Sequence, residues 1–110
     1  GMHHGLANAL CLVPVMNFNA RRKPGLYRRV GIACGLDVVT CSEGEADCRT
    51  VGFITQFLNG IGLRGGLREH GADPARIEQL ATQAWDDPCH RTNAVPVTRA
   101  DLLELYRQAL

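Results

Sequence analysis

The sequence predicts an all-α fold, a compact bundle of about five helices that forms a single domain over residues 1–110. Apolar residues recur at spacings of three and four in five separate segments, as on the buried face of a helix. Four of those segments follow a proline or a capping side chain that is typical of a helix start. Val38 and Val39 are the one β-branched pair beside a turn, which is too little to predict a sheet.

The first predicted helix begins near Leu6 and meets a proline at Pro14. Proline has no backbone N–H to donate to the carbonyl group of Leu10, so we expect a kink or an early end at this point. The apolar stripe of this segment consists of Leu6, Ala9, Leu10, Val13 and Met16.

The second predicted helix starts at Lys23-Pro24-Gly25, because proline is favoured in a first turn. Gly35 stands where a left-handed residue commonly ends a helix. The apolar residues expected on its buried face are Leu26, Val30, Ala33 and Cys34.

The third predicted helix follows Ser42, which forms a capping-box pattern with Glu45. In such a box, each side chain accepts a hydrogen bond from a backbone N–H that the helix start leaves unpaired. Four glycines end the helical pattern, namely Gly60, Gly62, Gly65 and Gly66. The residues expected to be buried are Cys48, Val51, Ile54, Leu58 and Ile61.

The last two predicted helices also have start signals. Asp73 and Pro74 supply a cap and a first-turn proline for one, and Thr98 with Asp101 repeats the capping pattern for the other. A long irregular connection over residues 86–96 joins them. Their apolar residues are Ile77, Leu80, Ala81 and Ala84, then Leu102, Leu105, Tyr106 and Ala109.

The composition is that of a globular protein without a strongly charged partner. Hydrophobic residues make up 45% and charged residues 21%, and the formal net charge is +1, so no overall field attracts nucleic acid or anionic lipid. No apolar run approaches the ~20 residues of a membrane helix, and no signal-peptide pattern is present. We therefore expect a cytoplasmic protein with no membrane partner. Gly1 is expected to be a cloning remnant before a native start at Met2.

The five cysteines show neither a disulfide pattern nor a metal-site spacing. Their number is odd, no pair has the C-x-x-C spacing, and three lie in helical segments, where a free thiol behaves as a small apolar side chain. We favour buried thiols and expect no structural zinc site. The cysteines are Cys11, Cys34, Cys41, Cys48 and Cys89.

The segment "RRKPGLYRR" gathers five basic residues around Tyr27. Such a segment could bind a phosphate backbone and stack a base. Because the whole chain is nearly neutral, we favour an ordinary solvent-exposed helix side and expect no nucleic-acid partner.

Two short stretches carry histidines that could act in chemistry. Cys89 and His90 could form a nucleophile with its base, but adjacent side chains rarely point at each other and no acid is placed to orient the histidine. His4 stands at the start of the first helix, where the helix dipole favours a neutral imidazole that can bind a metal. His3 would point elsewhere, and a stable metal site needs three or four ligands. From the residues alone, an exposed helix-start histidine is the default interpretation of His4.

Two long motifs carry a resemblance to a known family. "HGLANALCLVPVMNFN" resembles the segment H-G-x-x-N-A-x-x-L-P-x-V-x-x-F-N of the iron-containing, or group III, alcohol dehydrogenases. "DDPCHRTNAVPVTRADLLELYRQAL" is similar to the C-terminal stretch of that family, and "IGLRGGLREHGADPARIEQLATQA" is similar to its connecting helices. Two motifs in the right order, covering essentially the whole chain, are far more specific than either alone.

The resemblance implies the C-terminal helical domain of an NAD(P)-dependent alcohol dehydrogenase, with iron or zinc bound between it and a nucleotide-binding domain. The histidine of the H-G motif is one of four metal ligands in the family, and it matches His4. The loop that holds Cys89 and His90 matches a segment that the family places near the substrate pocket, so both are substrate-pocket candidates. His90 and Asn93 in this loop would have a positional role at most.

The chain departs from the family pattern at its start. The other three ligands, an aspartate and two histidines, lie upstream of the H-G motif in the family, where this chain has Gly1, Met2 and His3. His3 replaces a proline, and Pro14 is displaced by one residue. A single ligand lacks the chelate effect of a tetrahedral site, so we expect the isolated chain to bind neither metal nor NAD(P) tightly and to lack dehydrogenase activity.

Two functions are therefore in competition. The chain is either the metal-binding half of a dehydrogenase that acts with a complementary nucleotide-binding domain, or a stand-alone helical module for self-association or interaction. In both cases apolar surface that another domain would cover is left open, which favours association. We expect a homo-oligomer that buries the first helix around Leu6, Leu10 and Val13.

Overall fold

A computed structural model describes residues 2–110, and within that range it contains five α-helices and no strand. The helices are α1 (His4–Arg22), α2 (Arg28–Ala33), α3 (Glu43–Gly60), α4 (Ile77–Asp86) and α5 (Arg99–Ala109). Three short 3-10 helices lie in the connections: η1 (Arg68–His70), η2 (Pro74–Arg76) and η3 (Pro88–Thr92). The predicted all-α class with five helices is confirmed. No helix among the described residues has the length and apolar character needed to cross a membrane.

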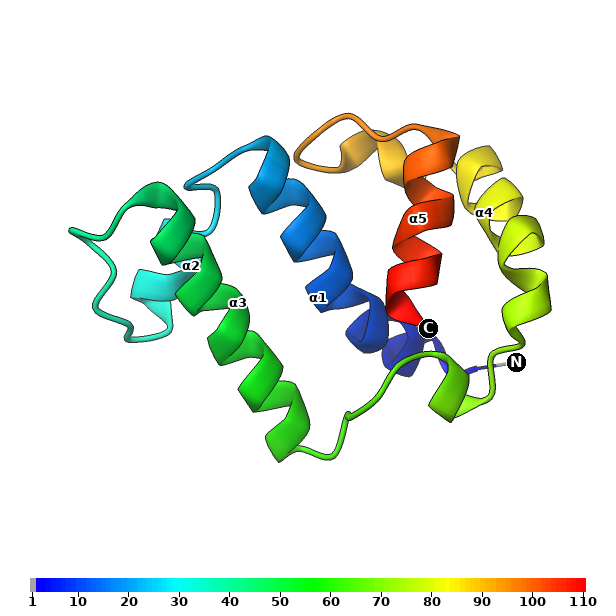
Figure 1. The fold of residues 1–110 in the computed structure, drawn as a ribbon, viewed down its shortest axis with the longest axis horizontal. Coiled ribbons are helices and arrows are strands. Elements are labelled where there is room, and N and C mark those ends of the chain that lie inside the picture. The colour runs from blue at the N-terminus through cyan, green and yellow to red at the C-terminus, as the bar shows by residue number, and fades with distance from the viewer. Residues whose placement is uncertain (1) are drawn as a thin grey trace.

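Four of the helices lie side by side in one layer in the order α3, α1, α5, α4, and α2 packs against α3 at the edge (Figure 1). The Cα atoms extend over 43 × 31 × 18 Å, so the molecule is a flat slab. A single layer covers its helices only from the sides, and most apolar side chains are therefore half-buried. One cluster of the core joins Leu10, Leu67 and Ala109.

The first helix runs through Pro14 and continues to Arg22, so of the two expected outcomes, a kink or an early end, the early end is wrong. Contacts with α3 on one side and α5 on the other hold the helix in place, and this packing offsets the one missing hydrogen bond. Leu10 is buried against Leu67. Leu10 therefore belongs to the core of the single chain, and the expected oligomer surface around Leu6, Leu10 and Val13 stays a prediction.

The side of α2 that faces α3 differs from the predicted apolar side. Val30 is 41% exposed, whereas Gly31 is buried against α3. An added Cβ at Gly31 would overlap the side chain of Thr50 and press on Val38, so the two helices approach through the glycine. The apolar side chains of α2 consequently point outward, because close approach matters more here than side-chain burial.

The end of α2 is as predicted. Gly35 has a φ of +85°, which glycine adopts without strain. Its N–H donates to the carbonyl of Ile32 at 2.9 Å, and the N–H of Leu36 donates to the carbonyl of Gly31 at 3.0 Å. These two bonds form the Schellman motif and pair carbonyls that the helix end would leave unpaired.

The predicted starts at Ser42, Asp73 and Thr98 are confirmed, although only one capping box is complete, whereas the second helix begins at Arg28 and not at Lys23-Pro24-Gly25, which form a turn. The hydroxyl of Ser42 accepts a hydrogen bond from the N–H of Glu45 at 3.2 Å. Thr98 and Asp101 form both bonds of the box, at 3.1 and 2.9 Å. Asp73 accepts from a backbone N–H at 2.9 Å and begins η2, which leads into α4.

The predicted buried face of α3 is only partly correct. Val51 is buried, but Cys48 is exposed and Ile61 is 58% exposed. Two polar residues, Asp47 and Thr50, are buried in their place because they bond to the chain segment that precedes α2. The expectation of buried thiols is also wrong, since Cys48 and Cys89 are exposed and the remaining cysteines are half-buried.

Candidate functional site

The two N-terminal histidines have different roles at the start of α1. His3 is the capping residue, and its ring Nδ1 accepts a hydrogen bond from the N–H of Gly5 at 3.1 Å. Its imidazole is thereby turned back onto the helix end. His4 is the first residue of the helix and is exposed, so its imidazole is accessible to a ligand.

Asn8 holds the ring of His4 from one turn further along α1. The amide nitrogen of Asn8 lies 3.1 Å from Nε2 of His4. This contact holds the imidazole against the side of α1. Within residues 2–110 no three side chains of histidine, cysteine, aspartate or glutamate gather as metal ligands. A tetrahedral iron or zinc site needs three or four such ligands.

The loop with Cys89 and His90 is built by local contacts. Asp87 begins η3, and its carboxylate accepts the N–H of Cys89 at 2.8 Å. The ring of His90 stacks on Trp85 with centroids 4.6 Å apart, and its Nε2–H donates to the carbonyl of Trp85 at 3.0 Å. The imidazole is therefore tied to Trp85 rather than to the neighbouring thiol.

The charge in this loop works against a nucleophilic thiol. A hydrogen bond to the carboxylate of Asp87, together with its negative charge, raises the pKa of Cys89 above its ordinary value. The same contacts lower the pKa of Asp87. A cysteine nucleophile needs its thiolate form, which this environment disfavours. The hydrogen bond and the charge of Asp87 therefore favour the protonated thiol of Cys89.

We expect the substitution Asp87→Asn to make Cys89 react several-fold faster with iodoacetamide near pH 8. Removal of the negative charge lowers the pKa of the thiol, and the asparagine oxygen can still accept the N–H of Cys89 and keep η3 in place. Mass spectrometry of each cysteine peptide measures the rates. The exposed thiol of Cys48 is the internal control, and an unchanged rate at Cys89 would contradict this account.

His4 and the Cys89–His90 loop lie at opposite ends of α1. Asn93, just after η3, forms two amide hydrogen bonds with Asn19, at 3.1 and 2.7 Å. Asn19 follows His4 by fifteen residues, which is about 22 Å along a helix. Figure 1 shows this loop beside the C-terminal end of α1 and the chain start beyond the other end. The structure therefore does not bring the predicted site residues together.

The pairing of Asn19 with Asn93 attaches the loop after η3 to α1. Asn19 is 4% exposed, and its amide also donates to the hydroxyl of Tyr27 at 3.1 Å. This buried amide pair fixes the loop on α1. It does not show that Cys89 or His90 faces a substrate, which stays a prediction.

Sequence reasoning missed a cavity of about 620 Å³ beside Asn8, between α1, α4, α5 and the loop that carries η1. Cys11 and Tyr106 line it and are half-buried, and burial raises the pKa of both groups. The one available signal is on α1, where Asn8 and Cys11 follow His4 at the helical spacings of four and seven. The other wall residues come from distant segments whose positions the sequence does not reveal.

Several residues of the basic segment have structural contacts. Arg22 pairs with Asp101 at 3.1 Å and lies over the ring of Phe18, 3.9 Å from its centroid. Arg28 donates to the backbone carbonyls of residues 38 and 39. These contacts support a structural role for part of the segment.

Comparison with known proteins matches the whole chain to one family. Residues 1–110 match the family model described as "Fe-containing alcohol dehydrogenase family, C-terminal". The chain is similar to the lactaldehyde reductase of Escherichia coli (strain K12), with 34% identity over 106 residues that cover 96% of this chain and 28% of the relative. It is also similar to the NAD-dependent methanol dehydrogenase of Bacillus methanolicus, with 26% identity over 109 residues, 99% of this chain and 29% of the relative.

A solved structure shows the same fold. The crystal structure of a 1,3-propanediol oxidoreductase superimposes on this chain with a TM-score of 0.91 and 25% identity. The match covers 99% of this chain and 28% of that one. The 110 residues thus span little more than a quarter of the proteins that they match.

Proposed function

Because this chain belongs to the Fe-containing alcohol dehydrogenase family and corresponds to its C-terminal domain, we propose that His4 is one metal ligand of an NAD(P)-dependent dehydrogenase. In this proposal the nucleotide-binding domain and the other three ligands for iron or zinc lie outside the 110 residues. The main observation behind this proposal is the position of His4. Its side chain is exposed, it is the first residue of α1, and it stands at the start of the matched motif. By itself the chain would be inactive and would bind metal weakly.

The packing of α1 and a contact from Asn8 fix the position of His4. Contacts with α3 and α5 hold α1, and Asn8 orients the imidazole at 3.1 Å. A metal that binds Nε2 of His4 must displace Asn8, whereas Nδ1 carries no hydrogen bond to a described residue. The single imidazole therefore gains useful affinity only when further ligands approach the same end of α1.

A chimeric enzyme tests this proposal. In it, this chain replaces the matched 106-residue segment of the Escherichia coli lactaldehyde reductase. We expect the folded chimera to bind about one equivalent of zinc or iron and to oxidise NADH with lactaldehyde. The variant His4→Ala should lower metal affinity by about 100-fold or more and abolish turnover, because it removes one of four ligands. Metal analysis, circular dichroism and NADH absorbance are the measurements.

The matched control for His4 is its neighbour. His3→Asn removes an adjacent imidazole but keeps an oxygen that caps the helix, so metal content and turnover should stay near those of the parent chimera. A His4→Ala chimera that keeps both metal and activity would overturn the assignment. Sub-micromolar, stoichiometric metal binding by the isolated chain that depends on His4 would also contradict it.

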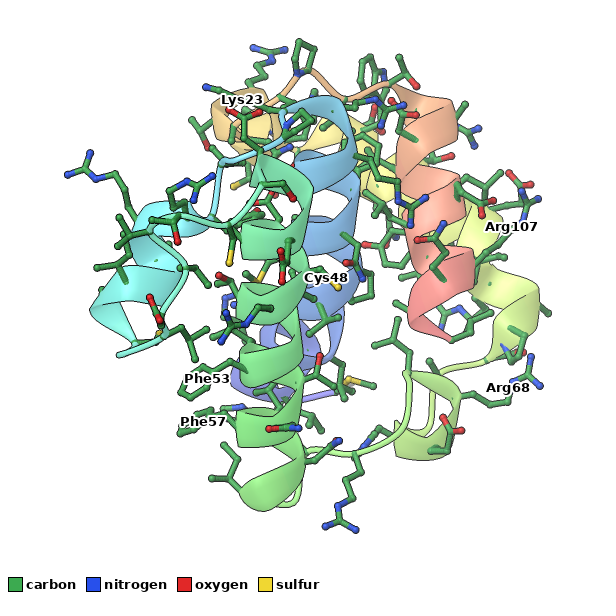
Figure 2. The ribbon with its side chains drawn as sticks, turned by 60° about the vertical axis from the view of Figure 1, so that its left-hand side comes forward. Lys23, Cys48, Phe53, Phe57, Arg68 and Arg107 are labelled. Carbon is green, nitrogen blue, oxygen red and sulfur yellow. The ribbon has the colours of Figure 1, made fainter. Side chains whose placement is uncertain are left out.

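A second candidate function, self-association, is favoured by exposed apolar side chains at the α2–α3 edge of the slab. Phe57 is 56% exposed, Ile61 58% and Val39 63%. Figure 2 shows Phe53 and Phe57 projecting from the same side of α3. Such a patch drives association in water. We propose that oligomers form through this edge rather than around Leu10, and a strict monomer by light scattering at high concentration would refute this.

We further propose a cytoplasmic location and no nucleic-acid or membrane partner. All five cysteines are free, which suits a reducing compartment. The formal net charge of +1 offers little attraction to a polyanion.

A further inference from the structure

We propose that the cavity beside His4 binds a small hydroxyalkyl carboxylate, with the hydroxyl end of the ligand near Asn8 and its carboxylate at Arg76. This inference rests on the proposed function, because it takes the His4 end of the cavity as the place of oxidation. The cavity, of about 620 Å³, lies within the range of known small-molecule sites, about 300–1,000 Å³. Asn8 lines it and contacts Nε2 of His4 at 3.1 Å, so a ligand that reaches Asn8 lies next to that imidazole.

The walls suit an alkyl chain with one oxygen at its end. The phenol of Tyr106 and the thiol of Cys11 line the cavity, and neither side chain forms a hydrogen bond with another described residue. Because burial raises the pKa of both groups, they remain protonated at neutral pH and can donate to an alcohol or aldehyde oxygen. The apolar part of the wall consists of Met2, Ala7, Leu67, Ala72 and Leu80.

The charged groups of the cavity leave one cation available to a ligand. Asp73 already accepts the N–H of Ala75 at 2.9 Å, and the ring Nε2–H of His70 donates to a backbone carbonyl at 2.7 Å. Arg76 donates from Nε to Gln79 at 3.3 Å, and no described residue pairs with its two terminal nitrogens. A guanidinium with two such nitrogens is suited to bind a carboxylate through charge-assisted hydrogen bonds.

The cavity is separate from the loop of Cys89 and His90, for which the family resemblance implies a place near the substrate pocket. Cys89 and His90 contribute no wall residue to it and lie near the far end of α1. Substrate choice would therefore depend on Arg76 and Tyr106, which come from η2 and α5.

Binding of two matched probes to the metal-free chain tests the proposal. The probes are 5-hydroxypentanoate and 1,5-pentanediol, which have the same chain length and a terminal hydroxyl and differ in the carboxylate. Titration followed by calorimetry and by amide NMR shifts should show at least about tenfold tighter binding of the acid, with the largest shifts at Asn8, Cys11 and Tyr106. The variant Arg76→Gln should abolish this preference.

Arg68→Gln is the matched control. Arg68 lies on η1, in the connection between α3 and α4 that also contains Arg76. It does not line the cavity, and its side chain points away from the protein in Figure 2. This variant should keep the preference. Tyr106→Phe should weaken binding of both probes several-fold, since it removes a donor to the hydroxyl that they share.

Three results would overturn the proposal: no binding of the acid, equal binding of acid and diol, or shifts confined to residues outside the cavity. A preference that survives Arg76→Gln would overturn the assignment of Arg76. These outcomes are separate from those of the chimera, because they require neither metal nor NADH. If the acid binds as expected and the chimera is inactive, the cavity site stands and the proposed dehydrogenase role fails.

Discussion

Replacing Gly31 with alanine should destabilise the protein by about 2 kcal/mol or more, although alanine is the better helix former. A Cβ at this position would overlap the hydroxyl of Thr50, which is fully buried on α3, and would lie 3.1 Å from a methyl group of Val38. To make room, α2 must move away from α3 and lose that packing. Urea denaturation followed by circular dichroism measures the change.

A double-mutant cycle makes this expectation specific to the contact. Thr50→Ala removes the overlapping oxygen and its hydrogen bond to the carbonyl of Ala46, and should cost about 1 kcal/mol by itself. In the Gly31→Ala/Thr50→Ala variant, the loss should be smaller than the sum of the two single losses by about 1 kcal/mol or more. Additive losses would show that the hydroxyl of Thr50 is not what limits the approach of α2.

The second large effect is expected at Asp47. The substitution Asp47→Ala should lower the free energy of unfolding by about 3 kcal/mol or more. This carboxylate is 4% exposed and accepts the backbone N–H groups of Gly25 and Tyr27 at 2.7 and 2.9 Å. Without it, two partly buried N–H donors lose their acceptor, and the turn between α1 and α2 is no longer attached to α3. Hydrogen exchange at these two amides and urea denaturation measure the loss.

Asp47→Asn is the matched control for charge and for acceptor number. Its amide has one oxygen and can satisfy one of the two donors, so about half of the alanine effect should remain. Equal losses in the two variants would mean that the negative charge, rather than the pair of hydrogen bonds, explains the role of Asp47.

Features that depend on a few neighbouring residues could be predicted from the sequence. Ser42, Asp73 and Thr98 begin their segments as expected, and Gly35 ends α2 in the left-handed region. Each of these signals acts over three or four residues, so no knowledge of the rest of the fold is needed. The same is true of His4 at the start of a helix, because the local pattern and the family motif both place it there.

Features that depend on distant contacts could not be predicted in this way. The periodicity of α2 suggested that Val30 faces inward, but the close approach at Gly31 turns it outward. On α3, the expected buried Cys48 is exposed, and Asp47 is buried because it bonds to a turn about twenty residues earlier. Hydrophobic spacing measures the apolar side of an isolated helix and carries no information on which side its neighbours touch.

The sequence by itself determined the helical class, the order of the helices and most of their ends, because local hydrogen bonding and apolar spacing encode them. Only the tertiary structure decided that α1 passes through Pro14, that Cys89 lies at the far end of α1 from His4, and that Asn8, Tyr106 and Arg76 share one cavity. These relations depend on how a flat layer of helices packs together, and packing joins residues that are far apart along the chain.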